Sequence, residues 1–427
     1  MMLRGTLDRY LAWRTGIRRA FNDHTRAPPV PCVTTDRSLH GVARPPMFSC
    51  RLALLVRLVT TSCGLAPFVL KTMIPHQISQ GRSMLIRHPY LLFLGDVSDQ
   101  LSAKTAQGIV DWRRDWCLGQ LRLPGCEADT GLPDMTVQQA ADAGAKTLIV
   151  GVVNAGGVLP EHWIGVIQEA LAAGLDVASG LHVRLSSIPA IAETARECGR
   201  ELFDVRHSDQ RFAVGKGTKR SGMRLLTVGT DCSVGKKYAA LALEKEMRAR
   251  GFDADFKATG QTGVFISGRG VAIDAVVADF ISGAVEWISP AADISHWDLI
   301  EGQGSLFHPS FAGVSLGLLH GAQADAFVVC HEPTRKTMRN VAHPLPSIRE
   351  VIDMTVRLGA LTNPSIRPIG ISVNTQALDE KAATDYLKRL QDEHFLPAAD
   401  PIRFGVGSIV DRIAADFPLT RGAAKVG

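Results

Sequence analysis

Residues 223–251 read MRLLTVGTDCSVGKKYAALALEKEMRARG, and the fold of the chain follows from this stretch. A short apolar run, Leu225 to Val228, leads into a loop bounded by Gly229 and Gly235, and a helical pattern follows at once. Strand, glycine-rich loop and helix in this order bind phosphate, because loop N–H groups and the positive end of the helix dipole face the anion. The stretch predicts a phosphate-binding P-loop of Gly229, Thr230, Asp231, Cys232, Ser233, Val234, Gly235, Lys236 and Lys237.

The loop departs in two ways from the common pattern G-x-x-x-x-G-K-[ST]. Five residues separate Gly229 from Gly235, a spacing that resembles the GTDTxVGKT loop of dethiobiotin synthetase and of its cobyrinate and cobyrate synthase relatives. In addition, Lys237 stands where the pattern has the Ser or Thr that binds Mg²⁺. Phosphate binding is therefore expected, whereas Mg-dependent nucleotide turnover stays open and no metal ligand set is predicted.

Length and composition favour a globular protein of two α/β domains, since the chain has 427 residues and is 46% hydrophobic. The longest apolar stretch, residues 52–70, contains Arg57 and Pro67, so no transmembrane helix and no membrane partner is predicted. The eight cysteines form no C-x-x-C pair. Neither a zinc site nor a disulfide framework is indicated, and a cytoplasmic location is expected.

The net charge of +5 is unevenly distributed. Residues 1–83 contain twelve Lys or Arg and three Asp or Glu, whereas residues 84–427 contain 35 and 39. The acidic body lacks a basic stripe with interleaved aromatic residues, so nucleic acid is not an expected partner. Residues 1–83 show no sustained period, and Met84 begins MLIRHPYLLFLGD, which looks like a natural start. We interpret residues 1–83 as a mis-annotated extension, with a disordered tail or a targeting segment as alternatives.

From residue 84 onward, apolar strand patterns alternate with helical patterns, which predicts mainly parallel sheets covered on both faces. We divide this part into a first α/β domain (84–210), a basic glycine-rich linker (211–222) and a P-loop domain (223–427). In the first domain, strands are predicted at 90–94, 117–123, 146–153 and 176–178, and helices at 101–112, 136–143 and 162–173. In the second, further strands are predicted at 252–257, 297–300, 326–330 and 368–373, and helices at 273–288 and 316–322. A polar loop at 260–263 could face the ligand, and a loose tail is expected after 418.

Polar residues follow several of these strands, at the sheet edge where open α/β folds bind ligands. Glu301 ends a buried strand before a glycine and is a candidate catalytic group or a helix cap. His331 follows the strand 326–330 and is either catalytic or an ordinary loop histidine. If their segment is helical, Arg335 and Arg339 share a face that suits a dicarboxylate or is simply solvated. In related P-loop enzymes, an asparagine placed like Asn374 contacts adenine.

The segments PYLLFLGD, KTAQGIVDWR, CLGQLRLPG, GTDCSVGKK, DFISGAVE, IEGQGSL and HEPTRK together resemble the N-acetyltransferase DgcN family, which acts on D-glutamate in bacterial D-amino-acid catabolism. The resemblance covers residues 84 to about 415. It implies a Rossmann-like domain before the P-loop domain, and transfer of an acetyl group from acetyl-CoA to an amine.

Under this resemblance the P-loop would hold the pyrophosphate of coenzyme A, with Lys236 and Lys237 replacing a metal. Acetyl transfer needs a general base, for which Glu301, His308 and His331 are candidates. Arg335 and Arg339 are the candidate clamp for the substrate carboxylate, and Cys232 could accept the acetyl group transiently.

Two other classes of function stay open, an ATP-dependent ligase or kinase of the dethiobiotin synthetase type using ATP and Mg²⁺, and a nucleotide-responsive binding module. A small amino-acid substrate and a homo-oligomer are the expected partners. Substrate stereochemistry depends on a chiral pocket that the sequence does not reveal.

Overall fold

The computed structural model describes residues 85–100, 102–153, 158–207 and 210–418. The predictions for residues 1–83 and for the tail beyond 418 lie outside these residues. Within the described ranges, no helix is long and apolar enough to cross a membrane.

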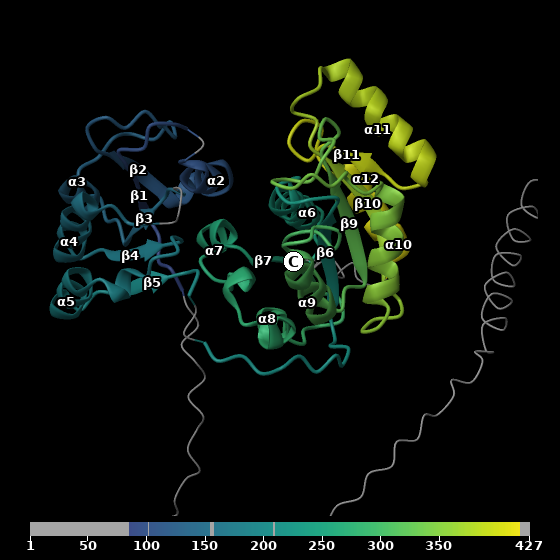
Figure 1. Ribbon diagram of the computed structural model, residues 1–427, viewed down its shortest axis with the longest axis horizontal. Coiled ribbons are helices and arrows are strands. Elements are labelled where there is room, and N and C mark those ends of the chain that lie inside the picture. Colours follow the sequence, from purple (N-terminus) through teal and green to yellow (C-terminus); the bar gives the residue numbers. More distant parts are fainter. Residues whose placement is uncertain (1–84, 101, 154–157, 208–209, 419–427) are drawn as a thin grey trace, which may run out of the picture. The chain divides into compact units, whose positions relative to one another are not determined.

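The first domain is built on a five-stranded sheet, in the order β2-β1-β3-β4-β5, and every neighbouring pair is parallel. Strand β1, which lies between β2 and β3, is fully buried, because its alternate residues pack on opposite faces of the sheet. Figure 1 shows α3, α4 and α5 on one face of this sheet and α2 on the other. The strands are β1 (Tyr90–Gly95), β2 (Cys117–Arg122), β3 (Thr147–Val150), β4 (Asp176–Ser179) and β5 (Leu202–Asp204), and the helices are α2 (Lys104–Arg113), α3 (Val137–Asp142), α4 (Ile164–Ala172) and α5 (Pro189–Cys198).

The second domain has a six-stranded parallel sheet in the order β11-β10-β9-β6-β8-β7. Helices α6 and α12 cover one face, while α8, α9 and α10 cover the other. The P-loop leaves the carboxyl end of a central strand, β6, which lies between β8 and β9. The strands are β6 (Met223–Gly229), β7 (Ala254–Lys257), β8 (Trp297–Ile300), β9 (Ala326–His331), β10 (Arg367–Val373) and β11 (Ala398–Ala399), and the helices are α6 (Lys236–Ala249), α7 (Gln261–Ser267), α8 (Ile281–Ile288), α9 (Ala312–Ala322), α10 (Ile348–Gly359), α11 (Glu380–His394) and α12 (Gly407–Asp416).

These two sheets confirm the predicted fold class, a Rossmann-like domain followed by a P-loop domain. Two local predictions were wrong. Residues 260–263, predicted as a loop, mostly begin helix α7, because Gly260 is its N-cap and Gly263 allows close packing against Glu301. Of the predicted helix 273–288, only α8 is an α-helix. Two short 3₁₀ turns, Ile273–Ala275 and Ala278–Phe280, precede it. Helices α5, α10, α11 and α12 and strands β5 and β11 were not predicted.

The two domains share one apolar cluster, which we call the shared core, in addition to clusters of their own. It contains Leu92 and Ile109 of the first domain together with Leu241, Phe256 and Phe265 of the second. Helices α2 and α7 pack against each other, and the Tyr90 hydroxyl donates a 3.3 Å hydrogen bond to the backbone oxygen of Phe265. The shared core brings the amino end of α2 close to the P-loop.

Candidate active site

The P-loop of the structure is a cradle of backbone N–H groups. Ser233 and Gly235 have positive φ angles of 54° and 97°, so alternate peptides turn inward. In the described part of the chain, no acceptor takes a hydrogen bond from the N–H groups of residues 231–237. Buried backbone donors are rarely left unpaired, so this cradle suits an anion.

Lys236 lies beneath the cradle. Its side chain is 7% exposed, and its Nζ donates a 2.7 Å hydrogen bond to the backbone oxygen of Asp231, which leaves two of its three donors for a ligand. Burial lowers the pKa of Lys236. Gly302 lets the loop after β8 lie close to strand β6 and to Lys236. A Cβ at this position would lie 1.7 Å from the Thr227 backbone oxygen and 3.0 Å from Lys236 Cδ.

Glu301 follows β8 and lies beside the cradle. Its Oε2 accepts hydrogen bonds from the N–H groups of Thr259 (3.0 Å) and Gly260 (3.1 Å), while Oε1 has no donor among the described residues. Burial raises the pKa of Glu301 to about 6, although Lys237 and the two N–H donors oppose that shift. A carboxylate with an open oxygen and a pKa near neutrality can take a proton from a substrate.

A cavity of about 700 Å³ adjoins both the cradle and Glu301, and we call it the acceptor cavity. Helices of both domains line it, α2 from the first and α6 and α7 from the second. Its charged lining residues are Glu301, Asp274, Lys104, Arg206, Lys236, Lys237 and Arg339.

The predicted carboxylate clamp is occupied by the protein itself. Arg335 Nη1 donates to Asp231 Oδ2 (2.7 Å) and to the oxygen of Cys232 (2.6 Å), and Arg339 Nη1 donates to Ser233 Oγ (2.6 Å). Asp231 also accepts from the Arg339 N–H at 2.7 Å. The segment carrying both arginines is not helical. These contacts fasten residues 332–340 over the P-loop, and only Arg339 lines the acceptor cavity.

The two candidate histidines lie away from the acceptor cavity. His331 Nδ1 is 3.1 Å from Thr230 Oγ1, and burial lowers the pKa of His331 to about 4. His308 is 1% exposed; its Nε2 donates to the Arg339 oxygen, and its Nδ1 accepts from the N–H of Ser310. Both rings are thus held by the protein, and of the three candidate bases only Glu301 lines the acceptor cavity.

Asp231, Cys232 and His308 offer the one cluster in the described ranges whose ligand atoms lie close enough to share a metal ion, within 4.8 Å of one another. Asp231 Oδ2 is paired with Arg335, although its buried Oδ1 has no partner among the described residues, and both nitrogens of His308 are used. Burial raises the pKa of Cys232, with Lys236 opposing. The donor set is therefore a poor fit for a divalent cation.

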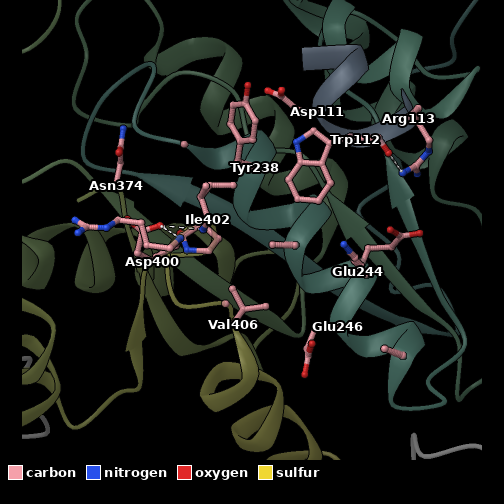
Figure 2. Close-up of a pocket in the computed structure, with 18 of the residues that line it drawn as sticks. Asp111, Trp112, Arg113, Tyr238, Glu244, Glu246, Asn374, Asp400, Ile402 and Val406 are labelled. Atoms are coloured by element: carbon pink, nitrogen blue, oxygen red, sulfur yellow. Dashed lines mark hydrogen bonds between the residues drawn. The ribbon is translucent and has the colours of Figure 1, made fainter. Parts of the chain in front are cut away.

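A second, larger cavity of about 1540 Å³ shares Gly235, Tyr238 and Asn374 with the acceptor cavity. Figure 2 shows Asn374 and Asp400 on one side of it and Trp112 on the other, with Tyr238 between them. The rings of Trp112 and Tyr238 are 6.0 Å apart. Asn374 uses its Oδ1 to accept from the N–H of Gln376, and its side-chain nitrogen has no acceptor among the described residues.

Gln261 lies in the polar segment 260–263 that the sequence suggested could face the ligand, and it lines the acceptor cavity. Sequence reasoning missed Lys104 and Arg206. They lie far from the P-loop in sequence, and only the packing of α2 on α7 brings Lys104 to the acceptor cavity. One feature of the sequence could have indicated Lys104: it begins the first helix after β1, close to the sheet edge where ligands bind.

The chain matches two family descriptions, "Domain of unknown function (DUF1611_C) P-loop domain" over residues 211–410 and "Domain of unknown function (DUF1611_N) Rossmann-like domain" over residues 121–208. It is 51% identical to a D-glutamate N-acetyltransferase of Tritonibacter scottomollicae, over 78% of this chain and 100% of that one. It is 50% identical to a D-glutamate N-acetyltransferase of a Pseudoalteromonas species, over 77% and 99%. The crystal structure of a DUF1611 family protein from Anabaena variabilis is similar, with a TM-score of 0.68, 29% identity, and coverage of 77% of this chain and 100% of that one.

Proposed function

This chain belongs to the DUF1611 family of two-domain proteins, alongside the D-glutamate N-acetyltransferases it matches, and on that premise we propose that it transfers an acetyl group from acetyl-CoA to the amino group of D-glutamate. The protein is accordingly an acyltransferase. The observation that carries the proposal within the chain is Glu301, a buried carboxylate with an open oxygen beside a phosphate cradle.

The cradle fits the diphosphate of coenzyme A. The unpaired N–H groups of residues 231–237 and the free donors of Lys236 match phosphate oxygens, and they need no metal. The larger cavity, with its aromatic pair and the free amide nitrogen of Asn374, would take the adenine end of the coenzyme.

Glu301 supplies the base for the reaction. The amine of D-glutamate attacks the thioester carbonyl carbon, so a C–N bond forms and the C–S bond breaks. The ammonium of D-glutamate first loses one proton to solvent. Glu301 Oε1 accepts the second proton as the amine attacks and passes it to the departing thiolate, which restores the carboxylate. With a pKa of about 6, Glu301 is ionised and ready at neutral pH, whereas His331 with a pKa of about 4 is a much weaker base.

An ATP-dependent ligase or kinase is less well supported, because Lys237 occupies the position of the Mg²⁺-binding hydroxyl. A cytoplasmic enzyme is in keeping with the five described cysteines, all of which are unpaired. We also propose that the protein assembles as a homo-oligomer.

The test follows thiol release and ADP release in parallel, using the full chain with D-glutamate and either acetyl-CoA or ATP·Mg²⁺. We expect thiol release that requires D-glutamate, without ADP. E301Q should lower kcat at least about a hundredfold, whereas E197Q, at an exposed position on α5, should not. ADP release without thiol would instead establish the ligase or kinase.

A further inference from the structure

Five cationic side chains line the acceptor cavity, and three of them are occupied. Lys236 donates to the Asp231 backbone oxygen and directs its two other donors to the phosphate, Arg339 donates to Ser233, and Arg206 pairs with Asp274 and donates to Gln261. The other two, Lys104 and Lys237, have no hydrogen bond and no ion pair with any described residue.

Lys237 contacts an aromatic ring but has no anionic partner among the described residues. Its Nζ lies 4.8 Å from the centre of the Tyr238 ring. It also lies 3.2 Å from the point where a Cβ on Gly108 would stand, so the glycine lets Lys237 pack closely against α2. Burial lowers the pKa of Lys237, and Glu301 acts against this. A half-buried ammonium with only an aromatic neighbour has no anion to balance its charge, and a ligand anion would complete the site.

Lys104 belongs to the other domain. It is the first residue of α2, and its exposed side chain reaches the same cavity from across the domain boundary. Its charge acts on Lys237 and adds to the pKa lowering there. Two unpaired cations in one cavity repel each other, and a dianion would relieve both.

We propose that Lys237 and Lys104 bind the two carboxylates of a dicarboxylic amino acid, Lys237 the α-carboxylate and Lys104 the side-chain carboxylate. This assignment rests on the proposed function, and it moves Lys237 from the coenzyme to the acceptor. It also replaces the occupied Arg335 and Arg339 as the carboxylate clamp.

The chemistry of the amino-acid substrate decides which lysine binds which carboxylate. The amine must reach Glu301, and the α-carboxylate is attached to the same carbon as the amine. Lys237 is the free cation whose charge acts most on Glu301, so it is the partner for the α-carboxylate. Lys104 then meets the far end of the side chain and selects for a second negative charge.

The first test compares D-glutamate with D-glutamine as acceptors. In wild type we expect a clear preference for D-glutamate. K104M should lower kcat/KM for D-glutamate about ten- to a hundredfold, mainly through KM, and leave D-glutamine nearly unchanged. K104R should restore most of the preference. K146M removes an exposed lysine of the same domain outside the cavity and should behave as wild type. An unchanged preference in K104M would overturn the proposal.

A second test measures binding without turnover. Glutarate has both carboxylates but no amine, and we expect it to bind wild type in calorimetry and to bind K104M and K237M at least tenfold more weakly. Circular dichroism would verify that both variants are folded. Equal glutarate affinity in all three proteins would overturn the inference even if acetyl transfer is active. Lysine-dependent glutarate binding without any acetyl transfer would support the dicarboxylate site and reject the acetyl-transfer proposal.

Discussion

Glu301 is the residue on which pH dependence should centre. Burial raises its pKa from 4.5 to about 6, so it is protonated and inactive as a base below that pH. We expect kcat/KM for D-glutamate to fall about tenfold per pH unit below pH 6, because the fraction of ionised Glu301 falls by that factor. A pH series of initial rates measures this, and an acid limb near pH 4 would point away from Glu301.

The same shift affects stability. The folded state binds an extra proton between pH 4.5 and about 6, so the free energy of unfolding falls as the pH rises through that window and stays lower above it. E301Q has no such group, and urea unfolding should show it losing less stability than wild type between pH 4.5 and 7. An equal loss in both proteins would mean that Glu301 is not destabilised by burial.

Gly302 should tolerate no side chain. A Cβ there would lie 1.7 Å from the Thr227 backbone oxygen, and backbone cannot move aside as a flexible side chain can. We expect G302A to lower the free energy of unfolding by roughly 2–3 kcal/mol. Gly165, exposed in α4 with open space around it, is the matched control, and G165A should be neutral or raise stability by about 0.5–1 kcal/mol. Denaturant unfolding of both variants compares the two.

For single residues, the sequence predicted which side chains follow a strand but not which other side chains they contact. Glu301 could be placed because a strand end is readable from an apolar run followed by glycine. The pairing of Arg335 with Asp231 joins positions 104 residues apart, and no local pattern encodes it. Lys104 was missed for the same reason, since its neighbour Lys237 belongs to another domain.

At the scale of the structural elements, the segment 332–340 stabilises the P-loop through hydrogen bonds to residues 231–233. Arg335 is the ion-pair partner of Asp231, which is fully buried. R335M leaves that carboxylate uncompensated, and we expect a loss of about 3 kcal/mol in the free energy of unfolding together with a higher KM for acetyl-CoA.

The double variant R335M/D231N distinguishes the loss of this ion pair from a nonspecific loss of stability. Because D231N removes the charge that R335M strands, the double variant should lose less stability than the two single losses added, by about 1–3 kcal/mol. Urea unfolding of the four proteins gives the coupling energy. Simple additivity would show that the two side chains do not support each other.

Element predictions worked best where one period dominates. The buried strands β1, β8 and β9 are continuous apolar runs, so their positions were readable. Helix α7 was not, since its glycines at positions 260 and 263 resemble a loop, and Gly263 is needed only because Glu301 Oε2 would lie 2.4 Å from a Cβ. The segment 273–288 has helical composition but makes two 3₁₀ turns before α8 begins.

For the molecule as a whole, the shared core predicts that both domains unfold together. Phe265 of α7 is fully buried among residues of both sheets. F265A should lower the free energy of unfolding by about 3–5 kcal/mol, because it leaves a cavity. L361A, at a 72% exposed position, is the control and should cost under about 0.5 kcal/mol.

Calorimetry distinguishes the two ways in which F265A could act. With one shared core, the variant shows a single transition at a lower temperature, because neither sheet keeps its apolar face covered when the other unfolds. Two separate transitions would mean that each domain is stable alone. The dicarboxylate site would then depend on docking of the domains, since Lys104 and Lys237 come from opposite sides of that core. A single transition instead makes the site a fixed property of the folded chain, and acetyl-CoA should raise the temperature of the whole transition rather than of one half.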